Sequence, residues 1–200
     1  LTMGEGGAVY TSDPLLAKIA LSYRDWGRDC WCQSGVDNTC KCRFTKQYGK
    51  LPLGYDHKYV YSHFGFNLKV TDMQAAIGCV QLDKLETFGK IRRKNFQYLY
   101  NNLKGCKELS FLEKYPESDP SYFGFLITIS DDAHFSRNKI TAYLEENHIQ
   151  TRNLFAGNLL RHPCFQDLSS GVDYRIAGDL IHTDKLMNDA FWIGVYPGMT

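Results

Sequence analysis

The segment "SHFGFNLKVTDMQAAIGCVQLDKL", residues 62–85, opens the strongest helical pattern in the chain. From Thr71 to Gly105, apolar residues recur at spacings of three and four, which places them on one face of a helix. We expect this face to be part of a hydrophobic core, and we expect two helices separated near Gly89. The pattern therefore predicts long helices between an N-terminal and a C-terminal part of the chain.

Other elements are marked by residues that begin or end them. Asp13, Pro14 and Gly27 have the positions of an N-cap, a first helical residue and a stop, which predicts a helix over 13–27. The long segment 28–62 has no helical period, so we expect an irregular, functional loop. The remaining expected elements are strands at 6–11, 109–112, 122–130 and 148–155, helices at 136–147 and 184–191, and a last strand in "FWIGV". This order indicates a small α+β domain attached to a larger unit.

Composition bounds the class of protein. The 200 residues are 44% hydrophobic and 22% charged, as in a globular protein, and the net charge is +1 with no basic tract. These values argue against a nucleic acid or an anionic membrane as partner, and no apolar run is long enough to span a bilayer. The chain begins at Leu1 without a recognisable signal peptide, so we expect a cytoplasmic protein and a fragment cut at both ends.

Four of the seven cysteines lie close together in "CWCQSGVDNTCKC", residues 30–42. An odd count cannot pair completely, and a cytoplasmic chain favours metal binding over disulfides. The Cys-x-Cys spacing is a poor match to the Cys-x-x-Cys knuckles of zinc sites, but spacing alone leaves zinc, an iron–sulfur cluster and unpaired thiols open. The other three cysteines are expected to be small core residues: Cys79, Cys106 and Cys164.

The glycine-rich run "GEGG" at 4–7 is compatible with a phosphate cradle or with a tight turn. It has neither the Walker pattern nor a dinucleotide fingerprint. We therefore expect a turn.

A family resemblance begins with Gly-aromatic-Asn at 65–67, followed by Asp-x-Gln-Ala-Ala-x-Gly-x-x-Gln-Leu at 72–82. Together with "GEGGAVYT", "YRDWGRD", "RRKNFQYLYNNL" and "YPG", these residues resemble the sugar aminotransferase family of fold-type I pyridoxal phosphate enzymes. The resemblance implies an α/β fold, with 1–70 as the end of the large cofactor domain and 71–200 as linking helices plus the small α+β domain. It also implies a homodimer in which Asn67 reaches the cofactor phosphate of the partner subunit. A loop-capping amide is the alternative role for Asn67.

The cysteine-rich loop and "TRNLFAGNLLRHPCF" resemble one branch of that family, the CDP-4-keto-6-deoxyglucose 3-dehydrases. The resemblance implies a 2Fe–2S cluster held by Cys30, Cys32 and Cys40, with a fourth ligand upstream of Leu1. Cys42 departs from the branch's pattern, and we expect it to be a bystander.

In that branch, the C3 hydroxyl of a nucleotide-linked 4-keto-6-deoxyhexose is removed through a pyridoxamine phosphate Schiff base in 3,6-dideoxysugar and lipopolysaccharide O-antigen biosynthesis. The 2Fe–2S cluster delivers the electrons, and an iron–sulfur flavoprotein reductase supplies them. The resemblance places the base two residues before Leu1, so we expect no catalytic residue within 1–200 and no activity from this segment alone.

Two further residues are candidates for the sugar or its diphosphate, Arg152 and Asn158, because guanidinium groups suit phosphate oxygens. A salt bridge or a turn is the alternative explanation for both. Because the base is expected elsewhere, His57 and His63 are expected to be polar loop or structural residues.

Two other functions remain open from the sequence. A pyridoxal phosphate-dependent sugar aminotransferase with a zinc-containing or empty cysteine loop would carry Lys, where the dehydrase carries His, two residues before Leu1. A non-catalytic metal-binding module would keep its own four ligands, with Cys42 among them.

Overall fold

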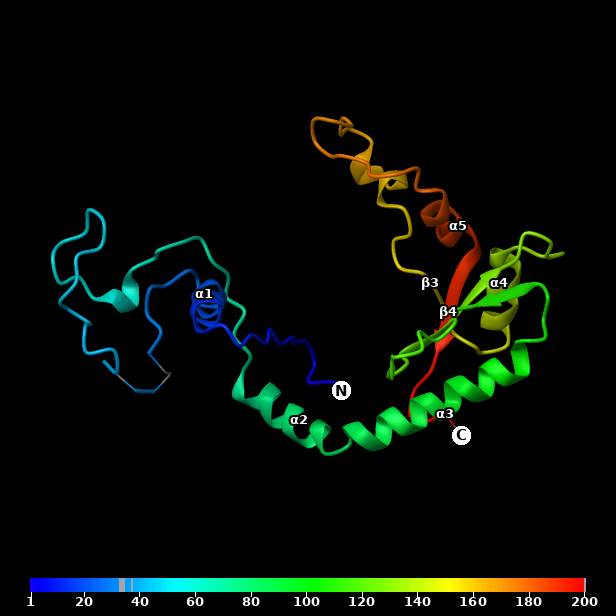
Figure 1. The fold of residues 1–200 in the computed structure, drawn as a ribbon, viewed down its shortest axis with the longest axis horizontal. Helices are drawn as coiled ribbons and strands as arrows, with labels where there is room; N and C mark the ends of the chain where they lie inside the picture. The colour runs from blue at the N-terminus through cyan, green and yellow to red at the C-terminus, as the bar shows by residue number, and fades with distance from the viewer. Residues whose placement is uncertain (33–34, 37, 200) are drawn as a thin grey trace. The chain divides into compact units, whose positions relative to one another are not determined.

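The computed structural model describes residues 1–32, 35–36 and 38–199, and the chain divides into two compact units, Leu1–Asp83 and Lys84–Thr200. Within the expected loop at 28–62, residues 33, 34 and 37 lie outside the described residues. Figure 1 shows the elements of each unit in chain order. The expected assignment of 1–70 to the large cofactor domain stays a prediction.

The first unit contains two helices whose starts the sequence predicted. Helix α1 (Pro14–Arg24) begins after Asp13, whose carboxylate accepts hydrogen bonds from the backbone N–H groups of Leu15 at 2.8 Å and Leu16 at 3.2 Å. Helix α2 (Asp72–Leu82) begins with a capping box, in which the Thr71 and Gln74 side chains each accept a hydrogen bond from the other residue's backbone N–H. Side-chain oxygens therefore satisfy backbone donors at both helix starts.

The break between the two linking helices lies at Asp83 and Lys84, so the predicted break near Gly89 is wrong. Helix α3 runs without interruption over Leu85–Leu103, and Gly89 is buried inside it. A glycine in a helix interior costs only about 1 kcal/mol relative to alanine, which tertiary packing can offset.

Two further predictions need correction, one in the first unit and one that involves both units. The expected strand at 6–11 is absent, and Val9 and Tyr10 are 84% and 92% exposed, because no strand among the described residues pairs with this segment. The three cysteines expected in the core are exposed. Cys79 lies on α2, Cys106 follows the turn after α3, and Cys164 lies in a 3₁₀ helix at the surface. Within the run at 4–7, the backbone bends at Gly4 and Glu5, with Gly4 at φ +84°, and continues without regular structure at Gly6 and Gly7.

The second unit is built on a four-stranded antiparallel sheet of order β1-β2-β4-β3. The strands are β1 (Leu109–Phe111), β2 (Gly124–Ile129), β3 (Thr151–Asn153) and β4 (Ala190–Gly194). Burial alternates along β2, where every second residue is in the core. The buried hydrophobic cluster consists of Phe125, Ile127, Ile129, Phe191 and Val195.

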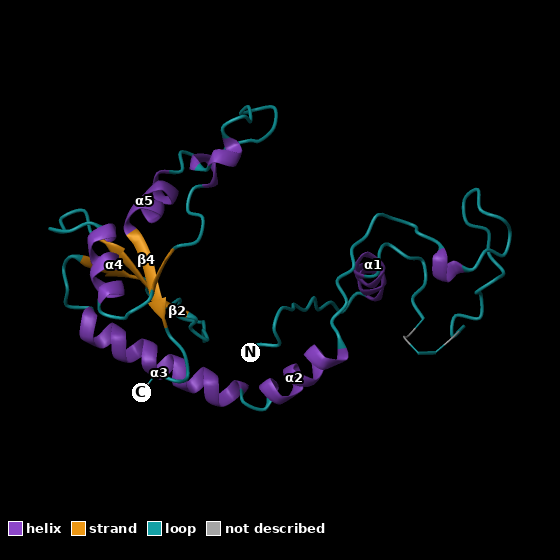
Figure 2. Ribbon diagram, turned by 180° about the vertical axis from the view of Figure 1, so that it is seen from behind, coloured by secondary structure: helices purple, strands orange, loops and turns teal. Residues whose placement is uncertain are grey.

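Helices α3 and α4 (Arg137–Glu146) supply the side chains that pack against this cluster, among them Phe96, Leu99 and Leu103 from α3 and Ile140 and Leu144 from α4. Figure 2 shows both helices beside the strands. Helix α5 (Ile181–Asp189) leads directly into β4. The predicted stripe is therefore core on α3, whereas on α2 it is exposed, with Met73 at 77% and Ile77 at 51%.

None of the helices in the described part of the chain has the length and apolar character needed to cross a membrane.

Candidate metal-cluster and cofactor site

The cysteine-rich loop is fixed to the rest of its unit just before Cys30. The backbone N–H of Asp29 donates to the carbonyl of Val60 at 3.0 Å, and that of Ser62 donates to the carbonyl of Gly27 at 2.8 Å. These bonds bring the start of the loop beside a short 3₁₀ helix, η1 (His57–Tyr59), which lies near the loop's end in the sequence.

Helix η1 is held in place by an ion pair. The carboxylate of Asp56 caps η1 by accepting from the Lys58 backbone N–H at 3.1 Å, and it accepts from Arg43 Nε at 3.1 Å and Nη2 at 2.7 Å. Arg43 holds the pKa of the Asp56 carboxyl below its usual range. The His57 backbone N–H donates to the Arg43 carbonyl at 3.3 Å, so the same residue also fixes the start of η1.

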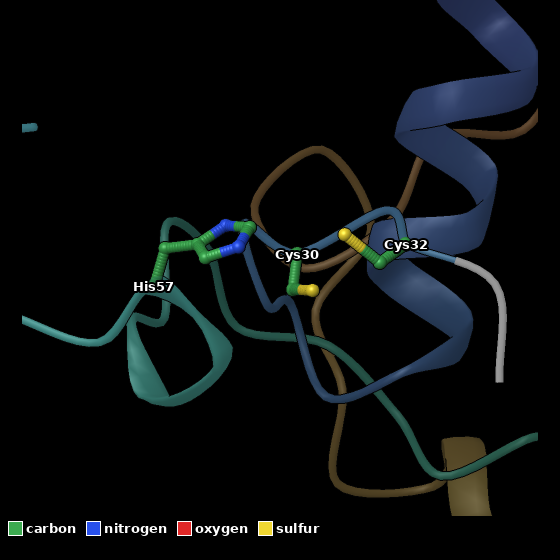
Figure 3. A group of neighbouring side chains, drawn as sticks. All are labelled: Cys30, Cys32 and His57. Atoms are coloured by element: carbon green, nitrogen blue, oxygen red, sulfur yellow. The ribbon is translucent and has the colours of Figure 1, made fainter. Parts of the chain in front are cut away.

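These anchors place the buried imidazole of His57 among the predicted ligands. The ligand atoms of Cys30, Cys32 and His57 lie within 4.8 Å of one another, and Figure 3 shows the imidazole directed toward the two sulfur atoms. The Sγ atom of Cys40 lies 3.3 Å from His57 Nε2. The structure therefore gathers all three predicted cysteines around a histidine that is 0% exposed.

The environments of the three thiols differ. The Thr39 hydroxyl and the Cys40 backbone N–H lower the pKa of Cys32 to about 7. Burial raises the pKa of Cys30. The Cys42 backbone N–H lowers the pKa of Cys40, but burial and the neighbouring Cys42 and Cys32 thiols raise it on balance. Of these three thiols, Cys32 has the lowest pKa and so the greatest thiolate fraction near neutral pH.

All seven cysteines are free, and each lies within the described residues. The half-buried Cys42 follows Cys40 on the chain and is not part of the group formed by Cys30, Cys32 and His57. Its expected role as a bystander stays a prediction.

The motif that carries Asn67 lies against the C-terminal end of α1. The Phe66 backbone N–H donates to the Tyr23 carbonyl at 2.7 Å, and the Trp26 N–H donates to the Phe66 carbonyl at 2.9 Å. Two glycines allow this approach: a Cβ at Gly27 would lie 1.9 Å from the His63 carbonyl oxygen, and one at Gly65 would lie 2.2 Å from the Gly27 nitrogen. The "YRDWGRD" and Gly-aromatic-Asn motifs thus form one local structure.

The exposed side chain of Asn67 is oriented by one contact with a cation. Its Oδ1 accepts from Lys69 Nζ at 2.9 Å, and the same ammonium group pairs with Asp25 at 2.9 Å and lies 3.4 Å from the centre of the Trp26 ring. The Asn67 amide nitrogen is not used by any other described residue. It is therefore available to donate to an oxygen atom from outside this chain.

The two predicted substrate residues have different surroundings. Arg152 is exposed on β3. Asn158 is only 3% exposed: its Nδ2 donates to Asp184 at 2.7 Å and its Oδ1 caps the 3₁₀ helix η2 (Leu159–Arg161) by accepting from the Leu160 N–H at 3.1 Å. Asn158 therefore connects η2 to α5, whereas the exposed Arg152 guanidinium makes only local contacts, with the Thr151 carbonyl at 3.4 Å and the side-chain amide of Gln150.

Sequence reasoning placed His57 in a polar loop and did not group it with the cysteines. The local signal was Asp56, a helix-capping residue immediately before it. That signal predicts a turn but not the direction of the imidazole. The exposed His63 stacks on Tyr23, with ring centroids 4.9 Å apart, and lies outside the cysteine group.

Comparison with known proteins agrees with the motifs. Residues 1–200 match the DegT/DnrJ/EryC1/StrS aminotransferase family, and the chain therefore belongs to that family. It is 53% identical to the lipopolysaccharide biosynthesis protein RfbH of Salmonella typhimurium, over 100% of this chain and 45% of that protein. It is 52% identical to the dTDP-4-dehydro-2,6-dideoxy-D-glucose 3-dehydratase of Saccharopolyspora spinosa, over 100% of this chain and 42% of that enzyme.

A solved structure supports the fold. The GDP-4-keto-6-deoxy-D-mannose-3-dehydratase of E. coli with bound hydrated PLP superposes with a TM-score of 0.72 at 22% identity, over 94% of this chain and 45% of that chain. This likeness confirms the predicted fold of the pyridoxal phosphate-dependent transferases. The chain spans less than half the length of the relatives that it matches.

Proposed function

We propose that the full-length protein removes the C3 hydroxyl of a nucleotide-linked 4-keto-6-deoxyhexose in the biosynthesis of a 3,6-dideoxysugar for lipopolysaccharide. The reaction would use pyridoxamine phosphate and a 2Fe–2S cluster. The names of two relatives support this proposal. One is a lipopolysaccharide biosynthesis protein, which supports the pathway, and the other is a sugar 3-dehydratase, which supports a reaction at C3 of the sugar.

One observation carries the proposal. In a chain of the aminotransferase family, three thiols from the cysteine-rich loop, Cys30, Cys32 and Cys40, lie around a buried imidazole. A transamination reaction does not need a thiol-bound cluster, because it transfers an amino group and a proton and requires no single-electron carrier. Removing a hydroxyl and replacing it with hydrogen does require electrons.

The residues present fit an iron–sulfur cluster. Thiolates are the usual ligands of such clusters, and a fourth ligand is expected from the part of the protein that precedes Leu1. The pairs that fix the loop, Arg43 with Asp56 and Asp29 with Val60, hold the thiols near one another without a metal ion. Cys30, Cys32 and Cys40 would therefore hold the cluster.

The chain also offers one contact to the pyridine cofactor. When bound, pyridoxamine phosphate supplies an amine for the C4 ketone and a ring that stores electrons, and the cluster transfers single electrons. Asn67 would donate its amide N–H to a phosphate oxygen across a homodimer interface. Lys69 would keep the Asn67 side chain oriented for this contact.

Arg152 is our proposed contact to the substrate. Its exposed guanidinium would donate to oxygen atoms of the nucleotide diphosphate, as planar guanidinium groups do. Asn158 would contribute by holding η2 in position next to the segment that follows β3.

The overall reaction balances with two electrons. The C3–O bond breaks, and the hydroxyl group leaves as water after taking up one proton. Two electrons that originate from NADH, together with a second proton, form the new C3–H bond. A flavoprotein reductase would split the hydride into single electrons for the cluster.

The main competing function is a pyridoxal phosphate-dependent sugar aminotransferase, since the family includes such enzymes. The test is to incubate the full-length protein with pyridoxamine phosphate, a flavoprotein reductase, NADH and CDP- or dTDP-linked 4-keto-6-deoxyglucose, and to determine the product by mass spectrometry. We expect a product that has lost the C3 oxygen and still carries no nitrogen. A 4-amino sugar formed with glutamate, without reductase or NADH, would contradict the proposal.

A further inference from the structure

The buried imidazole of His57 is not used by the proposed chemistry, yet it contacts the candidate cluster site from inside the unit. We infer that His57 is a positioning residue for the cluster: its Nε2–H group donates a hydrogen bond to the Cys40 sulfur and stabilises the reduced cluster. This inference rests on the proposed 2Fe–2S cluster.

The contact itself is the first support. His57 Nε2 lies 3.3 Å from Cys40 Sγ, within the range of a hydrogen bond to sulfur, and the ring also lies close to the sulfurs of Cys30 and Cys32. The imidazole is 0% exposed, and the Cys40 side chain is half-buried, so the ring reaches the sulfur from the protein interior. The ring is also held from the side by the edge of Trp31, with centroids 6.1 Å apart (Figure 3 shows the position of the His57 ring).

The other ring nitrogen indicates which tautomer is present. His57 Nδ1 is buried and has no hydrogen-bond partner among the described residues. A buried N–H without a partner is rarer in proteins than a buried acceptor without one. The proton is therefore better placed on Nε2, where it faces the Cys40 sulfur, with a lone pair on Nδ1.

The same observation argues against His57 as a direct metal ligand. A histidine that binds a metal through one nitrogen almost always donates its other N–H to a carboxylate, carbonyl or water. The Nδ1 atom of His57 has no such acceptor within the described part of the chain. A hydrogen bond from Nε2 to a ligand sulfur requires no second partner.

The effect of such a bond has a defined sign. Reduction adds one negative charge to the cluster, and part of that charge resides on the sulfur atoms. A donor aimed at a ligand sulfur stabilises the reduced form more than the oxidised form, which raises the reduction potential. Removing the donor should therefore make the cluster harder to reduce.

The experiment uses full-length protein with three substitutions. His57→Leu removes the donor, and His57→Gln retains an N–H group in a side chain of similar reach. His63→Leu is the matched control, because His63 belongs to the same unit but stacks on Tyr23 at the surface. For each protein, iron and sulfide content is measured first, and the midpoint potential is then determined by redox titration followed by electron paramagnetic resonance.

We expect all four proteins to contain iron and sulfide. His57→Leu should have a more negative potential than the wild type, His57→Gln should recover most of the difference, and His63→Leu should be unchanged. Equal potentials in the wild type and His57→Leu would overturn the inference while leaving the cluster intact. Absence of sulfide from the wild type would instead overturn the proposed cluster, and the inference with it.

A second measurement needs no substitution, in case His57→Leu does not fold. The reduced wild-type protein, labelled with ¹⁵N-histidine, is examined by pulsed electron paramagnetic resonance. A weak nitrogen coupling is expected for a hydrogen-bonded imidazole. The strong coupling of an iron–nitrogen bond would show that His57 is a ligand and would overturn the inference.

Discussion

Replacing Gly27 by alanine tests whether the turn after α1 and the loop that carries Asn67 form one structure. A Cβ at this position would lie 1.9 Å from the His63 carbonyl oxygen and 3.1 Å from the Gly65 nitrogen. Both neighbours are backbone atoms, so neither can rotate away as a flexible side chain could. Gly27 also has φ +80°, a conformation that residues with a Cβ rarely adopt.

The expected cost follows from these two effects. The left-handed conformation costs about 1–2 kcal/mol for a residue other than glycine. Overpacking against a rigid neighbour adds about 1–3 kcal/mol, so Gly27→Ala should destabilise the first unit by roughly 2–5 kcal/mol. The control is Gly49→Ala, because Gly49 has φ +51° but no atom within 4 Å of the added Cβ, and only the conformational cost applies.

The assay is urea unfolding of the full-length variants, together with hydrogen exchange of peptides that cover 20–30 and 60–70. Hydrogen exchange is needed because a chain with two units need not unfold in one step. Gly27→Ala should lose protection in both peptides and should also bind pyridoxamine phosphate less tightly. Equal destabilisation by the two substitutions, or an effect of Gly27→Ala below about 0.5 kcal/mol, would refute the close backbone contact.

Three further predictions concern single polar side chains. Asn67→Ala should weaken pyridoxamine phosphate binding roughly ten- to hundred-fold, as the loss of one hydrogen bond to a charged group does, with little change in the unfolding midpoint. Asn158→Ala should destabilise the protein by about 1–2 kcal/mol in urea, because it removes the hydrogen bond to Asp184 and the cap of η2, although Asp184 keeps its ion pair with Arg161. Asp56→Asn should make the free energy of unfolding depend less on pH in the acid range. Arg43 lowers the pKa of Asp56, so the ion pair stabilises the fold above the ordinary Asp pKa of about 4, and this contribution is lost as the pH falls.

Each of these three has a contradicting result. Unchanged cofactor affinity in Asn67→Ala would mean that Asn67 only caps its loop. An unaltered urea midpoint in Asn158→Ala, combined with a raised substrate KM, would assign Asn158 to the substrate instead of the fold. The same dependence of stability on acid pH in Asp56→Asn as in the wild type would exclude Asp56 as the titrating group.

Local signals in the sequence predicted the helix starts well. Asp13 and Pro14 predicted the start of α1, and the Asp13 carboxylate accepts hydrogen bonds from backbone N–H groups within the next few residues. The start of α2 was indicated by its apolar spacing, and the structure adds a capping box of Thr71 and Gln74. The division between α2 and α3 carried no such signal, because it contains neither proline nor glycine. Gly89 gave a false signal, because a glycine costs a helix interior only about 1 kcal/mol, and α3 packs on the core further along its length through Phe96, Leu99 and Leu103.

The candidate site was predictable only in part. Spacing and family resemblance indicated Cys30, Cys32 and Cys40, because the three thiols lie in one short segment. The contribution of His57 depends on an ion pair between residues 43 and 56 and on backbone bonds that bring its helix to the loop. Such contacts between distant residues leave no periodic pattern in the sequence. The burial of Cys79 could not be predicted for the same reason. A free cysteine is often a small core residue, but only where another element covers it, and Cys79 is exposed on α2.

The most direct test of the central claim is the metal and sulfide content of full-length protein purified without oxygen. We expect about two irons and two inorganic sulfides per chain. Cys30→Ser, Cys32→Ser and Cys40→Ser should each lose the cluster, whereas Cys42→Ser should retain it. Stoichiometric zinc without inorganic sulfide in the wild type would contradict the proposed cluster and would favour an aminotransferase with a structural zinc loop.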